Sequence, residues 1–179
     1  MAMTRRRGAI LTGAALAAVA VLAVGLYWFQ PWKLWQDATI AEALPTAPAA
    51  RPSGPGSAPP AAPLTVAEGT FISHEHATTG TARLVRLPDG SHTLRLEGLD
   101  TSNGPDLRVL LSDAPVKEGV AGWRVFDDGR HVSLGRLKGN KGDQNYALPA
   151  GVNPTDYGSV TIWCDRFDVS FGAASLKAA

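Results

Sequence analysis

The feature that most constrains the fold is a run of alternating apolar and polar residues near the C-terminus, residues 159–172. Val160, Ile162 and Cys164 occupy even positions, so their side chains share one face of an extended strand. After Asp165-Arg166 the apolar residues fall on odd positions instead. Because side chains alternate strictly along a strand, this change of phase requires an interruption. We predict two core strands separated by a bulge or tight turn beside Cys164, with Trp163 on the opposite face.

Short β-type runs of the same kind recur throughout residues 65–179, separated by turn-forming sequences such as Pro88-Asp89-Gly90-Ser91 and Asn103-Gly104-Pro105-Asp106. No stretch in this part has convincing helical periodicity, although Pro154–Tyr157 could form one helical turn. The pattern predicts an all-β domain over residues 65–179, an antiparallel β-sandwich or barrel. The other predicted strands are residues 70–73, 81–87, 92–97, 107–112, 123–126, 131–137 and 144–148.

The N-terminal part carries an uncharged apolar run, Gly8–Phe29, preceded by Arg5-Arg6-Arg7. About 20 apolar residues are enough for a helix to cross a hydrocarbon core of about 30 Å. Aromatic residues cluster at the far end of the run, where they prefer the membrane interface. By the positive-inside rule, residues 1–7 form a cytoplasmic basic tail and residues 8–29 a single-pass anchor in the cell membrane. The rest of the chain is then extracytoplasmic.

A cleaved signal peptide is the alternative interpretation of this segment. The basic residues and the small residues Ala17, Ala18 and Ala20 would suit one. The apolar region of a signal peptide, however, spans about 7–15 residues, which is shorter than this run. Both interpretations export the remainder of the chain.

Residues 30–64 are predicted to be an interfacial segment followed by a Pro/Ala-rich linker. Residues 37–43 could continue as a short polar helix, and residues 44–64 are rich in Pro, Ala, Gly and Ser. Such a composition cannot build a core and tends to extended, semi-rigid conformations. We expect it to act as a spacer between the membrane and the β domain.

Several classes of function are excluded by composition and motifs. The formal net charge is +1, and no basic patch with interleaved aromatic residues is present, so we expect no nucleic-acid partner. A single cysteine allows no internal disulfide and no multi-cysteine zinc site. The chain also lacks the nucleophile elbow, the zinc-protease motif, the phosphate loop and the dinucleotide fingerprint. A conventional enzyme with its own catalytic acid–base pair is therefore not expected.

Cys164 is the first candidate for chemistry. A free cysteine is commonly a small buried hydrophobe. An exported protein, however, seldom keeps a single thiol without a use, because its compartment oxidises the thiol or pairs it with another chain. The neighbouring Arg166 would lower the pKa of the thiol and Asp165 would raise it. A redox thiol and a structural cysteine both stay open at this point.

His74 and His76 form the second candidate. On a strand, two imidazoles two residues apart would lie on one side, as in a half-site for a metal or an axial ligand of haem. No third ligand is evident in the sequence, and an exposed polar strand end has the same pattern. His92 and His131 are isolated.

A set of spaced motifs runs through residues 65–179. The motifs are Gly69-Thr70-Phe71, His76, Gly80, Asp89-Gly90, Leu94-x-Leu96, Gly104-Pro105-Asp106-Leu107, Leu111-Ser112, Leu134-Gly135-x-Leu137-Lys138-Gly139, Gly142-x-Gln144-x-Tyr146-x-Leu148-Pro149, Tyr157, and Ser159-Val160-x-Ile162-Trp163-Cys164-x-x-Phe167-x-Val169-x-Phe171-Gly172-x-Ala174-x-Leu176. Together they resemble the DM-thirteen domain, often titled electron-transfer DM.

The resemblance implies an extracytoplasmic β-sandwich or barrel, found alone in bacteria and beside DOMON and cytochrome b-type modules in animals. It also implies that Cys164 matches a near-constant cysteine proposed to be a redox thiol or a haem ligand. We therefore expect a membrane-anchored β domain with a redox role through Cys164, haem as its candidate cofactor, and a redox partner protein. His76 is a second cofactor ligand in this hypothesis, and His74 with His76 a metal site. The alternative is a cell-surface binding module whose cysteine is structural.

Overall fold

The computed structural model describes residues 2–45 and 62–179, with side chains from Ile10 onward. The helical elements are α1 (Ala2–Phe29) and the short 3₁₀ helices η1 (Pro31–Trp35), η2 (Gly119–Gly122) and η3 (Pro154–Asp156). The strands are β1 (Thr39–Ala41), β2 (Leu64–Ser73), β3 (Thr78–Arg86), β4 (His92–Thr101), β5 (Leu107–Ser112), β6 (His131–Arg136), β7 (Lys141–Ala147), β8 (Ser159–Cys164), β9 (Val169–Ser175) and β10 (Lys177–Ala178).

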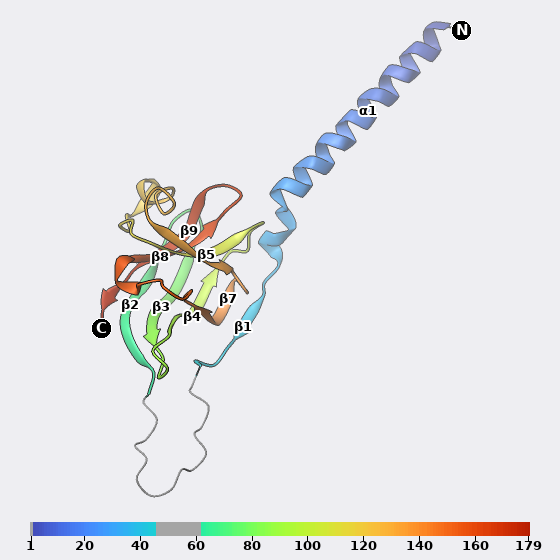
Figure 1. Cartoon of the computed structure of the whole chain (residues 1–179). Coiled ribbons are helices and arrows are strands. Elements are labelled where there is room, and N and C mark those ends of the chain that lie inside the picture. Colours follow the sequence, from blue (N-terminus) through green and yellow to red (C-terminus); the bar gives the residue numbers. More distant parts are fainter. Residues whose placement is uncertain (1, 46–61) are drawn as a thin grey trace, which may run out of the picture.

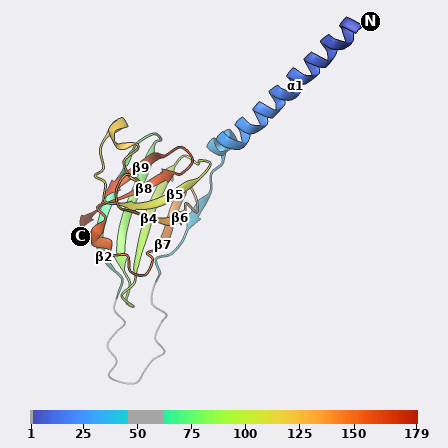
Figure 2. The ribbon, with the colours of Figure 1, turned by 45° about the horizontal axis from the view of Figure 1, so that its top comes forward.

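The strands form one ten-stranded sheet that curls into a half-barrel (Figures 1 and 2). The order is β1-β7-β4-β3-β2-β9-β8-β5-β6, with β10 beside β2. Strand β2 joins the two halves, because its first part pairs with β3 and its last residues, Phe71–Ser73, pair with β9. The prediction of an all-β domain is confirmed. The sheet is mixed rather than purely antiparallel, since β1 runs parallel to β7.

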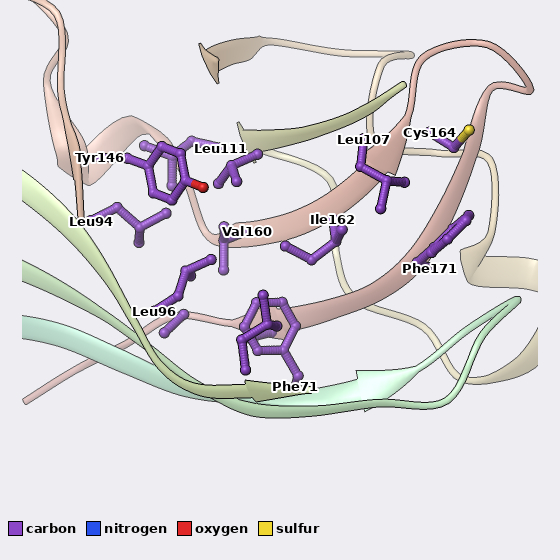
Figure 3. Close-up of a cluster of buried hydrophobic side chains, with 14 of the residues drawn as sticks. Phe71, Leu94, Leu96, Leu107, Leu111, Tyr146, Val160, Ile162, Cys164 and Phe171 are labelled. Atoms are coloured by element: carbon purple, nitrogen blue, oxygen red, sulfur yellow. The ribbon is translucent and has the colours of Figure 1, made fainter. Parts of the chain in front are cut away.

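The concave side of the curled sheet holds the main core. Leu94, Leu96, Val160 and Ile162 are fully buried there, with Phe71 beside them (Figure 3). Burying one such side chain contributes about 1.5–3 kcal/mol, so this cluster is the main source of stability. A smaller cluster covers the other face of β8, formed by Leu110, Ala114, Phe126, Trp163 and Ala173.

The predicted interruption beside Cys164 is a turn of four residues, 165–168, between β8 and β9. Cys164 pairs with Val169 across this hairpin, and Asp168 has a left-handed backbone conformation with φ of 50°. The turn explains why the apolar residues change from even to odd positions. Trp163 lies on the face opposite the main core, as predicted.

The prediction of a short helix over residues 37–43 is wrong, because Thr39–Ala41 form strand β1. The strand pairs with β7 at the edge of the sheet, where Ile40 lies opposite Gly142. Two glycines permit this close approach: a Cβ atom on Gly139 would contact the carbonyl of Ala38, and one on Gly142 the carbonyl of Ile40. Most of the expected Pro/Ala-rich spacer lies outside the described residues.

The prediction of a strand over residues 123–126 is also wrong. The chain forms η2 and then turns through this region, with the side chain of Phe126 buried in the smaller cluster. The turn predicted at Pro154–Tyr157 is confirmed as η3. Phe126 and Trp123 pack against the sheet from a loop, so apolar residues at these positions do not require a strand.

Helix α1 extends away from the β domain in both views (Figures 1 and 2). Its 20 residues Ile10–Phe29 are long and apolar enough to cross a membrane, and none of this span is buried in the protein. A membrane anchor and a signal sequence share these properties.

Candidate functional site

The turn between β8 and β9 contacts the C-terminal end of α1 through Arg166. Nη1 of Arg166 donates hydrogen bonds to the carbonyl oxygens of Tyr27 at 3.0 Å and of Trp28 at 2.8 Å. The guanidinium group also lies over the rings of Tyr27 and Trp28, at 5.7 and 5.4 Å from their centroids. The last carbonyls of a helix lack partners within the helix and carry partial negative charge. Arg166 therefore satisfies the end of α1 by hydrogen bonding and by charge, with cation–π contacts added.

The same turn is held from two further directions. Phe167 stacks on Phe29 of α1 with ring centroids 5.5 Å apart. On the domain side, Nη1 of Arg124 donates to the carbonyl oxygens of Phe167 at 2.9 Å and Asp168 at 3.2 Å. The left-handed residue Asp168 is thus fixed by contacts on its own carbonyl group.

A pocket of about 280 Å³ lies where the end of α1 meets the domain. Phe29, Pro31 and Leu34 line its helix side, and His76 and Phe171 belong to its domain side. Most of these surfaces are apolar or aromatic. We call this cavity the junction pocket.

His76 is one of the polar residues that line the junction pocket, together with Gln30, Lys33, Glu75 and Asn103. Its ring stacks on Phe171 with centroids 3.9 Å apart, and its Nε2 lies 3.9 Å from the carboxylate of Glu75. Burial lowers the pKa of His76, although the charge of Glu75 acts in the opposite direction. Among the described residues, this long approach to Glu75 is the polar contact of the imidazole. It is therefore a half-buried neutral ring that is only loosely held by Glu75 and can donate a hydrogen bond to a ligand.

His74 lies on the other face of β9, and both of its ring nitrogens have hydrogen-bond partners. Its Nδ1 is 2.7 Å from the hydroxyl of Ser170, and its Nε2 is 3.0 Å from the carbonyl oxygen of Lys117. Because a carbonyl only accepts, Nε2 carries the proton and donates, while Nδ1 accepts from Ser170. Burial lowers the pKa of His74, which keeps this neutral form.

The two histidines are not brought together on one side of a strand. Strand β2 ends at Ser73 and the chain bends through residues 74–76, which sends His74 toward Ser170 and His76 toward Phe171. These two partners are consecutive residues of β9 and face opposite ways. The residues that the structure describes contain no group of three or more His, Cys, Asp or Glu side chains that could hold a metal ion.

Cys164 is fully buried in the main core, at the same end as Leu107 and Phe171 (Figure 3). Burial raises the pKa of its thiol and is the largest effect on it. Backbone N–H groups of Arg166, Phe167 and Asp106 favour the thiolate and act in the opposite direction. The thiol is therefore protonated and shielded at neutral pH in this conformation.

The sequence profile of the electron transfer DM13 family matches residues 70–176, which is more than half of the chain. The chain belongs to the electron-transfer DM13 family. Searches of curated proteins and of solved structures found no match. The DM13 match includes the β8–β9 hairpin, Cys164, both candidate histidines and the domain side of the junction pocket.

Ligation of haem by Cys164 does not fit this DM13 domain as it stands. Cys164 is fully buried and is not among the residues that line the junction pocket. His76 does line it, so Cys164 and His76 do not face one common cavity. The pocket is also below the range of about 300–1,000 Å³ that is usual for drug-sized ligands, and haem is larger than those.

The sequence alone predicts neither the junction pocket nor the contact of Arg166 with α1. In the sequence, Arg166 is only a positive charge near Cys164. A usable signal was present, because aromatic residues at the end of an apolar helix mark an interface that another part of the chain can contact. Which part of the DM13 domain makes this contact depends on the fold.

Proposed function

We propose that this DM13 protein is a membrane-anchored electron-transfer module that works on the extracytoplasmic surface of the membrane. The observation that carries the proposal is the contact of Arg166 and Phe167 with the end of the apolar helix α1. With α1 in the bilayer, this contact holds the β8–β9 hairpin next to the interface. Arg5-Arg6-Arg7 favour a cytoplasmic N-terminus, which directs the domain outward.

Cys164 is the redox group in this proposal, in thiol–disulfide exchange with a partner protein. The thiol loses its proton, and its sulfur attacks a disulfide of the partner. One S–S bond forms between the two proteins, the partner's S–S bond breaks, and the released thiolate takes up a proton. Since Cys164 is buried and its pKa is raised, the turn 165–168 has to open first.

A second function is favoured by the same burial. A cysteine with no exposed surface that packs in an apolar cluster behaves as a core residue. The protein would then be a cell-surface binding module in which Cys164 has only a structural role. The family membership supports the first function, and the environment of the sulfur supports the second.

The deciding experiment measures alkylation of Cys164 in the folded protein beside its unfolding free energy. Reaction through local opening, faster than global unfolding allows, supports the redox role. Reaction only through global unfolding supports the structural role. An absorption spectrum of the purified protein tests haem directly, because a Soret band would contradict the lack of fit described above.

Anchoring is tested separately in intact cells. Protease added outside should remove the β domain and leave a small membrane stub. Recovery of a mature form that begins near Ala20 from the medium would instead identify a cleaved signal peptide.

A further inference from the structure

We propose that the junction pocket binds the ring headgroup of a membrane-soluble quinone, with His76 as the hydrogen-bonding residue. The inference rests on the membrane-anchored part of the proposed function and is independent of any redox role for Cys164. The inference is that the quinone binds in this pocket, and it includes no electron-transfer step.

The position of the pocket favours a ligand that comes from the bilayer. One wall is the end of the apolar helix, represented by Phe29, and the first residues after it, Pro31 and Leu34. With α1 in the membrane, these residues lie at the interface between lipid and water. A ligand with a long apolar tail could leave the tail among the lipids and place only its head in the pocket.

The lining of the pocket favours a flat ring with an acceptor atom. Phe29, Phe167 and Phe171 contribute aromatic surfaces, which pack well against another planar ring. His76 contributes a ring nitrogen whose polar contact among the described residues is a long one, 3.9 Å to the Glu75 carboxylate, and which can donate to a carbonyl oxygen of a ligand. The two carbonyl groups of a quinone ring match this combination. An acyl chain would leave the imidazole without a hydrogen bond.

The size of the pocket agrees with a headgroup rather than a larger cofactor. Its volume of about 280 Å³ lies just below the usual range for drug-sized molecules, about 300–1,000 Å³. A single six-membered ring with small substituents is well within that volume. Burial lowers the pKa of His76 and favours the neutral imidazole, and the two charged residues of the lining, Lys33 and Glu75, have opposite signs.

The test uses the full chain in lipid nanodiscs and a benzoquinone with a decyl tail. Quenching of tryptophan fluorescence, with Trp28, Trp32 and Trp35 beside the pocket in sequence, reports binding. His76→Ala removes the hydrogen-bonding ring, and we expect affinity to fall about tenfold. His76→Gln keeps a donor and should retain most of the affinity. His131→Ala, which alters an exposed histidine outside the pocket, is the matched control and should bind as the wild type does.

Four outcomes would overturn the inference. Quenching that does not saturate, or that is equal in His76→Ala, would show simple partitioning into the bilayer. Full displacement by an equal concentration of decanol would show that an acyl chain fills the pocket. Cys164→Ala separates the two proposals, because it removes thiol chemistry and should leave quinone binding unchanged. If the wild-type protein does not bind the quinone but its Cys164 thiol still reacts, this inference is wrong and the proposed redox function still stands.

Discussion

The guanidinium group of Arg166 donates a hydrogen bond to the carbonyl oxygen of Trp28 at 2.8 Å. It joins two residues that are 138 positions apart in the chain, one in the β8–β9 turn and one in the last turn of α1. Arg166 follows the buried Cys164 by two residues. The contact therefore links the helix end directly to the part of the domain that holds the only cysteine.

Arg166→Ala should free the β8–β9 turn from α1 without unfolding the domain. The variant loses both hydrogen bonds to the helix carbonyls, and these lie outside the β-sheet. In the full chain in nanodiscs, we expect faster hydrogen exchange in residues 165–168. In a fragment of residues 36–179, which lacks α1, the free energy of unfolding should change by less than about 0.5 kcal/mol.

Arg124→Ala is the matched control for that experiment. Arg124 donates to the carbonyls of Phe167 and Asp168 from within the domain. Its removal should loosen the turn in the full chain and in the fragment alike. An equal effect of Arg166→Ala in both forms would contradict a role for Arg166 in holding the helix.

Strand β1 should make the fragment 36–179 more stable than the fragment 65–179. The longer fragment keeps the pairing of β1 with β7 and the Glu42 carboxylate, which accepts from Lys138 Nζ at 2.7 Å and from Asn145 N at 2.8 Å. A few such hydrogen bonds and partly exposed ion pairs are worth about 1–3 kcal/mol together. Urea denaturation of both fragments measures the difference, and the shorter one should still fold cooperatively as a β protein.

Glu42→Ala in the longer fragment serves as the control, because it removes the carboxylate and keeps the strand. It should reduce the difference between the fragments without abolishing it. The Lys138 hydrogen bond, with a further one from Asn145, lowers the pKa of Glu42 below its usual 4.5. Its stabilising effect is therefore complete above pH 4.5 and is lost as the pH falls through the lowered value. Equal stability of the two fragments at neutral pH would show that β1 does not dock.

The hairpin could be predicted from sequence because its signal is local. The alternation of Val160, Ile162 and Cys164, and its change of phase, follow from two-residue periodicity and need no partner. Strand β1 could not be predicted in this way. It has three residues at a sheet edge and depends on two glycines, Gly139 and Gly142, about 100 positions later.

The site was less predictable than the fold for a related reason. The expectation that His74 and His76 share one side assumed a continuous strand, but β2 ends at Ser73. The junction pocket combines residues 29–34 with residues from three later segments, so neither side of it has a motif of its own. Spacing along a chain identifies neighbours on one element, whereas this pocket depends on how separate elements meet.

Acid should weaken the fold through His74. Burial lowers its pKa below the usual 6.5, so around pH 6 the unfolded chain binds more protons than the folded one. Stability contributed by the neutral imidazole is therefore complete above pH 6.5 and falls as the pH drops below that value. Urea midpoints of the 36–179 fragment at pH 7.5 and pH 5.5 measure the loss.

His74→Gln should flatten that pH dependence, because glutamine does not titrate and its amide group can both donate and accept. His131→Gln, at an exposed position on β6, should leave the wild-type slope in place. Burial also lowers the pKa of His76, so part of the dependence of stability on pH will remain in His74→Gln. An unchanged slope in His74→Gln would mean that its neutral form does not stabilise the fold.

Substitutions of Cys164 should separate its packing from its chemistry. Cys164→Ala removes one buried atom and should cost about 1–2 kcal/mol through lost contacts and a small cavity. Cys164→Ser instead places a hydroxyl at a fully buried position in an apolar cluster. A buried hydroxyl without a partner costs about 1–3 kcal/mol, so Ser should be less stable than Ala. Urea midpoints of the three proteins measure this.

The remaining question is whether the sulfur can be reached without unfolding the domain, and Arg124→Ala answers it. If the turn 165–168 opens locally, wild-type Cys164 will be alkylated faster than global unfolding allows. Arg124→Ala removes the hydrogen bonds that hold the Phe167 and Asp168 carbonyls, so it should raise the alkylation rate more than it lowers global stability. If alkylation instead follows global stability in both proteins, the sulfur is sealed in the core. Thiol exchange is then not its function, and Cys164 is a structural residue.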